Sequence, residues 1–437
     1  MTNKLVPKSI EILERLQQLH PKQIDLSLDR LMILLKKLGN PHLKVPPTIH
    51  IAGTNGKGST ATFLRYLLHE QGYSTHTYTS PHLIKFNERI RINSKLISNQ
   101  YLMSLLEECE KNNLNRPITF FEITTAAAIL AFSRVSADFL ILETGLGGRF
   151  DATNIVENKI CNVITPISMD HMGFLGNSIR SITNEKIGIL RSSVQTVISP
   201  QKNIVSKIIE KFATEKDIVL YSYGKKWKII DIDEKKNKFK FQFLEEIENY
   251  TIPDLFGRHQ IFNSAAALVV LKIITKNKIN KTLVDKAFKK TEWPARMQKL
   301  SNGPLNKLSG ERFELWVDGG HNDEAGFLLA QTLKKWKKHR LFLILGMIKG
   351  KTPKKFLDHL IQFVDCTIII PVEGHHFIPP KKILNYYKYS KKNILERENV
   401  EQSIQYISSK YSEGKIIICG SLYLAGAVLK KNNFKIV

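Results

Sequence analysis

The most informative stretch of the sequence is glycine-rich and carries a lysine followed by hydroxyl side chains. It runs over 52–60 as Ala-Gly-Thr-Asn-Gly-Lys-Gly-Ser-Thr. Glycines let a backbone curl so that its N–H groups converge on a phosphate, and the start of a helix adds partial positive charge. Lys57 supplies a cation and Ser59 or Thr60 a hydroxyl, so the segment predicts a phosphate-binding loop. It departs from the Gly-x-x-x-x-Gly-Lys-[Ser/Thr] pattern, because Ile51 stands at the first glycine and Gly58 follows the lysine.

The segments around this loop alternate between strand and helix patterns. Short, continuous apolar runs are typical of strands buried on both faces of a parallel sheet. Such runs occur at Thr48–Ala52, Phe139–Glu143 and 162–165, and a helix is predicted over 59–71, before Gly72. We therefore predict an α/β fold whose N-terminal part is a P-loop ATPase-like domain with a mostly parallel sheet.

The second half of the chain predicts a further α/β unit. A charged, alternating stretch at 231–243 predicts a hairpin turning near Lys236, with one solvated face. Strand-like runs then recur at Phe313–Val317, Leu341–Leu345, 367–370 and 415–419. We place the boundary near Trp293-Pro294. The prediction is a catalytic domain at 1–293 and a smaller, Rossmann-like C-terminal domain at 294–437.

Charge is the outlying feature of the composition. The 437 residues include 65 Lys and Arg against 40 Asp and Glu, a formal net charge of +25. Such a balance raises long-range attraction for nucleic acids and other anions. No helix-turn-helix, RRM signature or basic stripe interleaved with aromatics accompanies it, so we interpret the excess mainly as surface composition. Nucleic-acid binding stays open as an alternative function of another class.

The cysteine pattern and the N-terminus favour a reducing compartment. Cys109, Cys161, Cys366 and Cys419 lie far apart with no Cys-x-x-Cys pair, which predicts neither a disulfide framework nor a zinc knuckle. The first residues lack the apolar core of a signal peptide, and no apolar run approaches the ~20 residues that span a bilayer. We expect a soluble, cytoplasmic protein with no membrane partner.

Beyond the loop, a series of motifs resembles the Mur-type ATP-dependent amide ligases, in particular their folate branch of dihydrofolate synthases and folylpolyglutamate synthases. The resemblance extends over nearly the whole chain, and the motifs follow in the family's order. They are the segments 53–59, 79–83, 86–91, 121–122, 143–154, 170–176, 185–189, 257–260, 294–296, 318–322 and 420–424. The segment 143–154, Glu-Thr-Gly-Leu-Gly-Gly-Arg-Phe-Asp-Ala-Thr-Asn, is the longest and most specific of them.

The resemblance implies a ligase that forms an amide in two steps. A carboxylate of dihydropteroate or of a folate γ-glutamyl chain attacks the γ-phosphate of ATP, and the L-glutamate amine then displaces phosphate from the acyl phosphate. It implies ATP and Mg²⁺ as cofactors, with two ions, and a monomer as the assembly. The implied ATP-binding residues are Thr54, Asn55, Gly56, Lys57, Gly58, Ser59, Asn263, Arg296 and Asp318.

The resemblance also assigns the metal ions and the chemistry. Glu143 ends an apolar strand, at the edge where open α/β sheets bind ligands, and with Ser80 and His171 it makes an oxygen and nitrogen set suited to Mg²⁺. Lys186 is carbamylated in the family and would hold a second ion; an ordinary lysine facing the phosphates is the alternative. Lys57, Lys186 and His321 are the catalytic candidates, and His321 and Ser421 are expected near glutamate or the transferred phosphate.

Three further segments resemble the folate-binding regions of bifunctional bacterial members. Asp25 could hydrogen-bond a pterin amide edge, and Phe120 or Phe121 could stack on its ring; packing of these rings in the core is equally open. The candidate residues are Ile24, Asp25, Leu26, Thr119, Phe120, Phe121, Glu122, Phe150, Asp151 and Ala152.

Two departures from the family pattern limit the transfer of roles. Gly320 stands where the family usually has Ala, and the loop 346–352 lacks both acids of the Asp-Lys-Asp that ends it in many members, so no role is transferred to that loop. Two other functions stay open: a Mur-type ligase joining a different acid to a different amino acid, and a kinase, which the phosphate loop alone would also fit.

Overall fold

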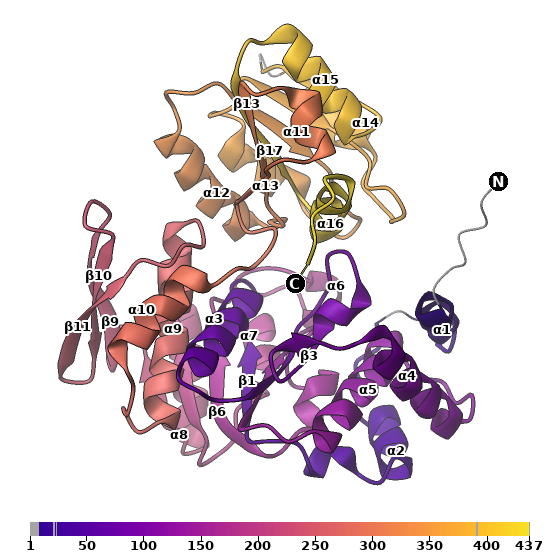
Figure 1. The fold of residues 1–437 in the computed structure, drawn as a ribbon, viewed down its shortest axis with the longest axis vertical. Helices are drawn as coiled ribbons and strands as arrows, with labels where there is room; N and C mark the ends of the chain where they lie inside the picture. Colours follow the sequence, from indigo (N-terminus) through magenta and orange to yellow (C-terminus); the bar gives the residue numbers. More distant parts are fainter. Residues whose placement is uncertain (1–7, 21, 23, 390–391, 437) are drawn as a thin grey trace.

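Two α/β units, one above the other, make up the molecule (Figure 1). This computed structural model describes residues 8–20, 22, 24–389 and 392–436. The lower unit contains an eight-stranded and a three-stranded sheet, and the upper unit contains a six-stranded sheet. The predicted boundary at 293/294 lies in the connection between α10 (Lys281–Lys290) and β12 (Gln298–Lys299).

An eight-stranded, mostly parallel sheet forms the centre of the N-terminal domain. Its order is β4-β3-β2-β5-β1-β6-β7-β8, and only the pairs that involve β3 are antiparallel. Alternate residues of β5 face different cores, since Leu140 and Leu142 pack in one cluster and Ile141 in another. The strands are β1 Thr48–Ala52, β2 Thr75–Tyr78, β3 Ile90–Ile92, β4 Lys95–Leu96, β5 Phe139–Glu143, β6 Lys159–Ile164, β7 Gln195–Ile198 and β8 Leu220–Ser222.

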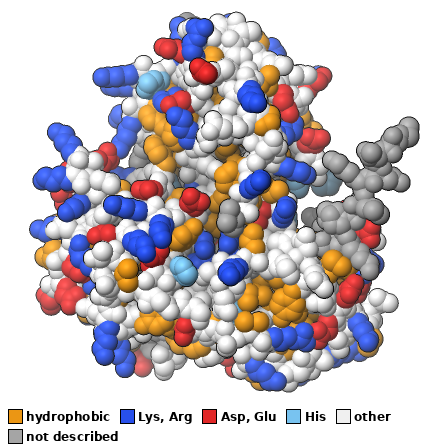
Figure 2. All heavy atoms as spheres, in the orientation of Figure 1, with side chains coloured by type: hydrophobic (Ala, Val, Ile, Leu, Met, Phe, Trp, Pro, Cys, Tyr) orange, Lys and Arg blue, Asp and Glu red, His pale blue; other side chains and the backbone are white. Residues whose placement is uncertain are grey.

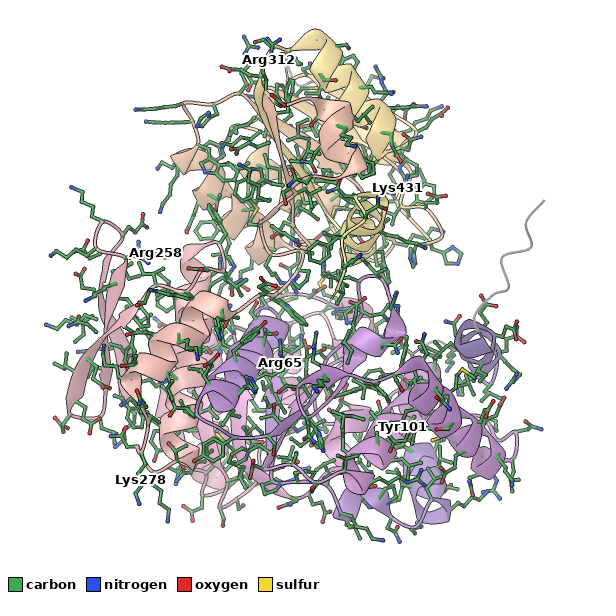
Figure 3. All side chains as sticks on the ribbon, in the orientation of Figure 1. Arg65, Tyr101, Arg258, Lys278, Arg312 and Lys431 are labelled. Carbon is green, nitrogen blue, oxygen red and sulfur yellow. The ribbon has the colours of Figure 1, made fainter. Side chains whose placement is uncertain are left out.

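Helices cover both faces of this sheet. α3 begins at Lys57, two residues earlier than predicted, and packs along α9, whose residues from Ser264 to Lys272 are all buried. Figure 3 shows Arg258 near the top of this domain and Lys278 at its lower edge, so α9 starts beside the C-terminal domain and runs away from it. The helices are α1 Lys8–Leu16, α2 Asp29–Lys37, α3 Lys57–Glu70, α4 Asn99–Asn113, α5 Phe120–Arg134, α6 Met172–Leu175, α7 Ile179–Ile187, α8 Asn203–Glu215, α9 Arg258–Ile274 and α10 Lys281–Lys290, with short 3₁₀ turns at Pro41–Leu43, Phe86–Arg89 and Ala152–Ile155.

The predicted hairpin is present but belongs to a three-stranded antiparallel sheet. β9 (Trp227–Asp233) and β10 (Lys238–Phe243) form it, and β11 (Glu246–Thr251) adds a strand that the sequence reasoning missed. Phe239, Phe241 and Phe243 alternate toward the core shared with α3 and α9. The solvated face of the hairpin is therefore as predicted.

The C-terminal domain contains a six-stranded sheet in the order β12-β13-β17-β14-β15-β16, parallel except for β12. Each apolar run predicted as a strand is one. The strands are β12 Gln298–Lys299, β13 Phe313–Val317, β14 Leu341–Leu345, β15 Cys366–Ile369, β16 Ile394–Glu396 and β17 Gly414–Cys419, and the helices are α11 Pro304–Ser309, α12 Asp323–Lys335, α13 Pro353–Leu360, α14 Pro380–Asn385, α15 Val400–Lys410 and α16 Leu422–Lys431. The α/β class and the two-domain organisation are confirmed.

Lysine and arginine side chains are scattered over both domains on the face drawn in Figure 2, with acidic side chains between them. This face therefore fits a basic surface composition better than a single nucleic-acid-binding stripe. All four cysteines are buried and free, as their spacing predicts. Among the described residues, no helix has the length and apolar character needed to cross a membrane.

A close backbone contact joins the two domains. Gly426 of α16 faces the carbonyl of Leu83 so closely that a Cβ at position 426 would lie 2.0 Å from the carbonyl oxygen. The carboxylate of Glu88 accepts hydrogen bonds from the N–H groups of residues 83–85 and holds that loop in place. Glycine at 426 is therefore a condition for this docked arrangement.

Replacing Gly426 by alanine is expected to separate the domains without unfolding α16. Alanine favours a helix by about 1 kcal/mol over glycine, whereas its Cβ clashes with Leu83. Circular dichroism should be unchanged and the radius of gyration from small-angle X-ray scattering should rise. Gly173→Ala in α6, where a Cβ meets nothing within 4 Å, is the control. An unchanged scattering profile for Gly426→Ala would contradict the interpretation.

Candidate active site between the domains

The phosphate loop lies between the end of β1 and the start of α3. Gly53 passes so close to the residue after β6 that a Cβ at position 53 would lie 1.9 Å from Thr165 Oγ1. Gly56 has a φ of 84°, and a Cβ there would lie 2.6 Å from Asn263 Oδ1. Thr54 N–H and Asn55 N–H both donate to the Pro166 carbonyl, which fixes the curve. The first N–H groups of α3 have no partner within the helix, so they suit an anion.

Two lysines converge on this loop. Lys57 Nζ donates to the carbonyls of Gly53 and Thr54 at 3.2 and 3.3 Å, and the buried Lys186 Nζ donates to the Gly53 carbonyl at 2.8 Å. Burial, and after it the charge of Lys57, lowers the pKa of Lys186 to about 7. The neutral amine of Lys186 is therefore more readily formed than that of an exposed lysine.

Glu143 ends β5 beside the same loop, as predicted. Its carboxylate is buried and, among the residues that the structure describes, accepts one hydrogen bond, from Ser80 N–H at 3.2 Å. Burial raises the pKa of Glu143, and the nearby charges of Lys57 and Arg296 oppose that rise. A buried carboxylate with so few partners is a suitable ligand for a cation.

His171 stands at the start of α6 with a left-handed backbone, φ 52°. Desolvation and the charge of Lys351 keep its pKa below the ordinary value, so the imidazole is neutral and able to ligate a metal. No cluster of three or more His, Cys, Asp or Glu suited to a metal occurs in the part of the chain that the structure describes. The predicted set instead offers one carboxylate, one imidazole and one hydroxyl, which fits Mg²⁺, since this ion keeps waters and substrate phosphates as ligands.

The predicted nucleotide residues come from three elements near the loop. Asn263 in the second turn of α9 lies beside Gly56 and donates to Gln260 Oε1 at 3.0 Å. Arg296 follows the domain boundary and is flanked by two residues of positive φ, Ala295 at 58° and Met297 at 44°. This strained turn is held because Asp318 accepts the Met297 N–H at 2.9 Å.

Asp318 and Arg296 lie near a histidine that the sequence reasoning left without a role. The pKa of His259 is lowered to about 4, chiefly by burial, with Asp318 raising it and Arg296 lowering it. His259 belongs to the Gly-Arg-His-Gln motif at 257–260. Its presence in that motif was the only feature of the sequence that could have indicated a place in the site.

His321 and Ser421 occupy adjoining loops at the ends of β13 and β17. The Gly420 N–H donates to the Gly320 carbonyl and joins the loops. His321 contacts the carbonyl of Gly319 through Nδ1 at 3.0 Å, and its Nε2 lies 3.5 Å from the carboxylate of Asp170 across the domain interface. Ser421 caps α16 by accepting the Tyr423 N–H.

Asp170 lies in the motif at 170–176, but the sequence assigned it no role. In the structure it contacts three residues across the domain interface. It contacts Lys351 at 2.7 Å, Asn322 at 3.2 Å and His321, all from the C-terminal domain. Asn55 of the phosphate loop also reaches across, donating to Glu324 at 2.6 Å. The C-terminal domain thus touches both the phosphate loop and the segment that carries His171.

The candidate folate residues near the N-terminus join those of α5 through Arg30. This guanidinium contacts Asp25 at 2.9 Å, and two of its nitrogens donate hydrogen bonds to the Glu122 carboxylate at 3.0 and 3.1 Å. Thr119 and Glu122 form a capping box at the start of α5. Ile24 is exposed and Leu26 is half-buried.

The remaining folate candidates have different degrees of exposure. Phe121 is held over Gly145, where a Cβ would lie 2.4 Å from the ring, and Phe120 lies edge-on to Phe86 at 5.9 Å. Phe150 is exposed, whereas Asp151 is buried and accepts hydrogen bonds from the N–H groups of Leu146 and Thr153. Ala152 is buried beside it. The carboxylate of Asp151 therefore hydrogen-bonds to the backbone of its own loop.

Matches to known families cover both domains. The Mur ligase middle domain matches residues 51–271, and the C-terminal domain of dihydrofolate synthetase matches residues 299–431. The chain belongs to the Mur ligase family. In this Mur ligase, the first match includes the predicted phosphate loop, the end of β5 and most of α9. The second match includes the loops that carry His321, Lys351 and Ser421.

Relatives of this Mur ligase match almost the whole chain. It is 32% identical to the dihydrofolate synthetase of Saccharomyces cerevisiae over 94% of this chain and 98% of the relative. It is also 32% identical to the dihydrofolate synthase/folylpolyglutamate synthase of Bacillus subtilis, over 92% of this chain and 94% of the relative. The chain therefore lies in the folate branch.

Solved structures show the same two-domain fold. Escherichia coli FolC in complex with DHPP and ADP has a TM-score of 0.86 and 28% identity, covering 98% of both chains. A bifunctional folylpolyglutamate synthase/dihydrofolate synthase with Mn, AMPPNP and L-glutamate bound has a TM-score of 0.83 and 26% identity, covering 97% of both chains.

Replacing Lys57 by alanine is expected to remove at least ~99% of turnover, because the loop loses the cation that we predict to face the phosphates. The fold should be retained, since Lys57 Nζ bonds only to carbonyls of its own loop among the described residues. Nucleotide-dependent phosphate release and thermal unfolding measure the two effects. Lys207→Ala, on the exposed face of α8, is the control. Near-normal turnover of Lys57→Ala would contradict the assignment.

Proposed function

We propose that this chain is an ATP-dependent ligase that adds L-glutamate to dihydropteroate and to the γ-glutamyl chains of tetrahydrofolate. The observation that carries the proposal is the meeting of two sets of groups at the domain interface. The phosphate loop and Glu143 come from one domain, and His321 and Arg296 come from the other. Bound DHPP, ADP, AMPPNP and L-glutamate in the related structures fit this arrangement.

The phosphate loop binds ATP in this proposal. The first N–H groups of α3 and the ammonium of Lys57 contact the phosphates, and Ser59 supplies a hydroxyl. Asn263 and Arg296 contact the nucleotide from the side of α9 and the domain connection, and Asp318 faces its ribose or base. These roles use groups that the fold already holds close to the loop.

Ser80, Glu143, His171 and carbamylated Lys186 would hold two Mg²⁺ ions. Bound there, Mg²⁺ supplies charge neutralisation for the phosphates and for the attacking carboxylate. Manganese bound in a related structure supports a divalent cation as a cofactor. The buried carboxylate of Glu143, with its single N–H partner among the described residues, supports the choice of ligand.

The chain's groups then position two reactions rather than forming a covalent enzyme intermediate. A folate-side carboxylate attacks the γ-phosphate of ATP, ADP leaves and an acyl phosphate forms. The amine of L-glutamate, held near His321 and Ser421, attacks the acyl carbon and phosphate leaves. Positioning and cationic stabilisation of the phosphoryl group supply the rate enhancement, which explains why a nucleophilic serine or cysteine is not needed.

The folate substrate is placed beside α5 and the loop after β5. Phe120 and the exposed Phe150 offer ring faces, whereas Asp25 and Glu122 are already paired with Arg30. Ile24, Leu26, Thr119, Phe121, Asp151 and Ala152 would shape the pocket around them. We also propose that the enzyme acts as a monomer in the cytoplasm.

The purified protein with ATP, Mg²⁺ and L-glutamate is expected to release phosphate when dihydropteroate is added, and also when tetrahydrofolate is added. Phosphate release and mass spectrometry of the glutamylated product measure both activities in parallel. Turnover with only one acceptor would restrict the proposal to that activity. Absence of product with both acceptors would overturn the folate assignment, and a phosphorylated product without an amide would indicate a kinase.

Carbamylation of Lys186 is expected to be visible directly. The amine is buried, its pKa is about 7, and neutral amines are the form that reacts with CO₂. In ¹³C-labelled bicarbonate, NMR of the enzyme should show a carbamate carbon that disappears in Lys186→Arg. Lys159, another buried lysine with a pKa lowered to about 6, is the matched control. A signal that survives Lys186→Arg and disappears in Lys159→Arg would place the carbamate at the wrong residue.

A further inference from the structure

Asp170 is an N-terminal-domain carboxylate on which two loops of the C-terminal domain converge. Lys351 Nζ lies 2.7 Å from its Oδ1, and Asn322 Nδ2 donates to its Oδ2 at 3.2 Å. His321 Nε2 lies 3.5 Å from the same Oδ2. The loop that follows β13 and the loop that follows β14 are thus anchored to one side chain of the other domain.

The ion pair is shielded from water. The exposed fractions of the Lys351 and Asp170 side chains are 8% and 10%. Two charges this deeply buried are stable only while they face each other, because each alone would lose its hydration without compensation. Exposed ion pairs, such as that of Lys354 with Asp358, carry no such constraint, since water solvates both partners when they separate. Contact between the domains and formation of the Lys351–Asp170 pair therefore depend on each other.

The same carboxylate holds the backbone next to it. Asp170 Oδ1, the oxygen that contacts Lys351, also accepts the N–H of His171 at 2.8 Å. His171 has a left-handed φ of 52°, a conformation that an L-residue adopts only when its surroundings hold it there. The position of the His171 side chain is thus linked through Asp170 to the C-terminal domain.

We propose that Lys351 is a positioning residue whose ion pair with Asp170 locks the closed arrangement of the domains and, through the Asp170–His171 turn, sets the place of His171 in the site. Its loop lacks the two acids usual in the family, so Asp170 is the only carboxylate among the described residues that pairs with Lys351. The kinetic part of this inference rests on the proposed ligase function. The structural part does not.

A second role for Lys351 is conceivable on the same geometry and makes a different prediction. Lys351 also lines a cavity of about 330 Å³ together with Lys349, Lys382 and Tyr386. If Lys351 served mainly to hold an anion in this cavity, its loss would be independent of Asp170. Lys349 lies two residues away, is exposed, and has no ion pair in the described part of the chain, which makes it a matched control of equal charge.

Lys351→Met is expected to lower kcat by about 10- to 100-fold while the KM for ATP changes less than about threefold, because closure and not nucleotide binding is impaired. Lys351→Arg should restore much of the loss, and Lys349→Met should leave both constants unchanged. Small-angle X-ray scattering with Mg²⁺ and AMPPNP should show a larger radius of gyration for Lys351→Met than for Lys349→Met. Scattering does not require turnover, so it tests the inference even if the ligase function is wrong.

A double-mutant cycle decides between the two roles. In an Asp170→Asn background, adding Lys351→Met should cost at most about twofold, since the pair is already broken. Full, multiplicative losses from the two substitutions would overturn the proposal and favour the anion-binding role. An equal loss of kcat in Lys349→Met, or unchanged scattering of Lys351→Met, would also overturn it.

Discussion

The phosphate loop can follow its path only because residues 53 and 56 have no side chains. Gly53 is pressed against Thr165 of the loop after β6, and Gly56 against Asn263 of α9. These two contacts bring together the start of α3, the carboxyl end of β6 and the helix α9. Lys57, Lys186 and Glu143 then have fixed places around the loop, since each is attached to an element that the contacts have already positioned.

Several cations in this region lie close to buried carboxylates. The charge of Lys57 contributes to lowering the pKa values of His171, Lys186 and Lys351 and opposes the rise that burial causes in the pKa of Glu143, so it acts on four groups of the site. Such a site is unfavourable when empty of anions and favourable when phosphates and carboxylates enter it. The net charge of +25 adds a background field, whereas in the proposed function these few placed cations provide the specificity.

The strands and the phosphate loop could be predicted because their signals are local. A buried parallel strand needs a continuous apolar run, as in Leu341–Leu345, and a phosphate loop needs its own glycines and lysine. The third strand β11 was missed, since Glu246–Thr251 has only two apolar residues, Ile247 and Tyr250, which lie three positions apart and so do not alternate; the segment becomes a strand by pairing with β10. The capping box of Thr119 and Glu122 was not predicted, because these residues were interpreted as part of a segment that resembles a folate-binding region.

The partners of Asp170 could not be predicted, because they lie more than a hundred residues away on another domain. Lys351 is 181 positions from Asp170, and Asn322 is 152 positions away. A spacing of that size carries no periodic signal. Only the packing of the two domains brings these side chains together. The loop 346–352 itself had no role assigned because it lacks both acids of the family pattern.

The burial of all four cysteines has a practical side. The thiolate is the reactive form of cysteine, and desolvation raises the pKa of every one of these thiols, that of Cys161 to about 12 and that of Cys366 to about 11. A cysteine introduced on the surface of each domain would therefore react far faster with a maleimide than any native one. The native enzyme is in effect already prepared for site-specific dye labelling, so the distance between its domains can be followed by fluorescence during turnover without first removing cysteines from the core.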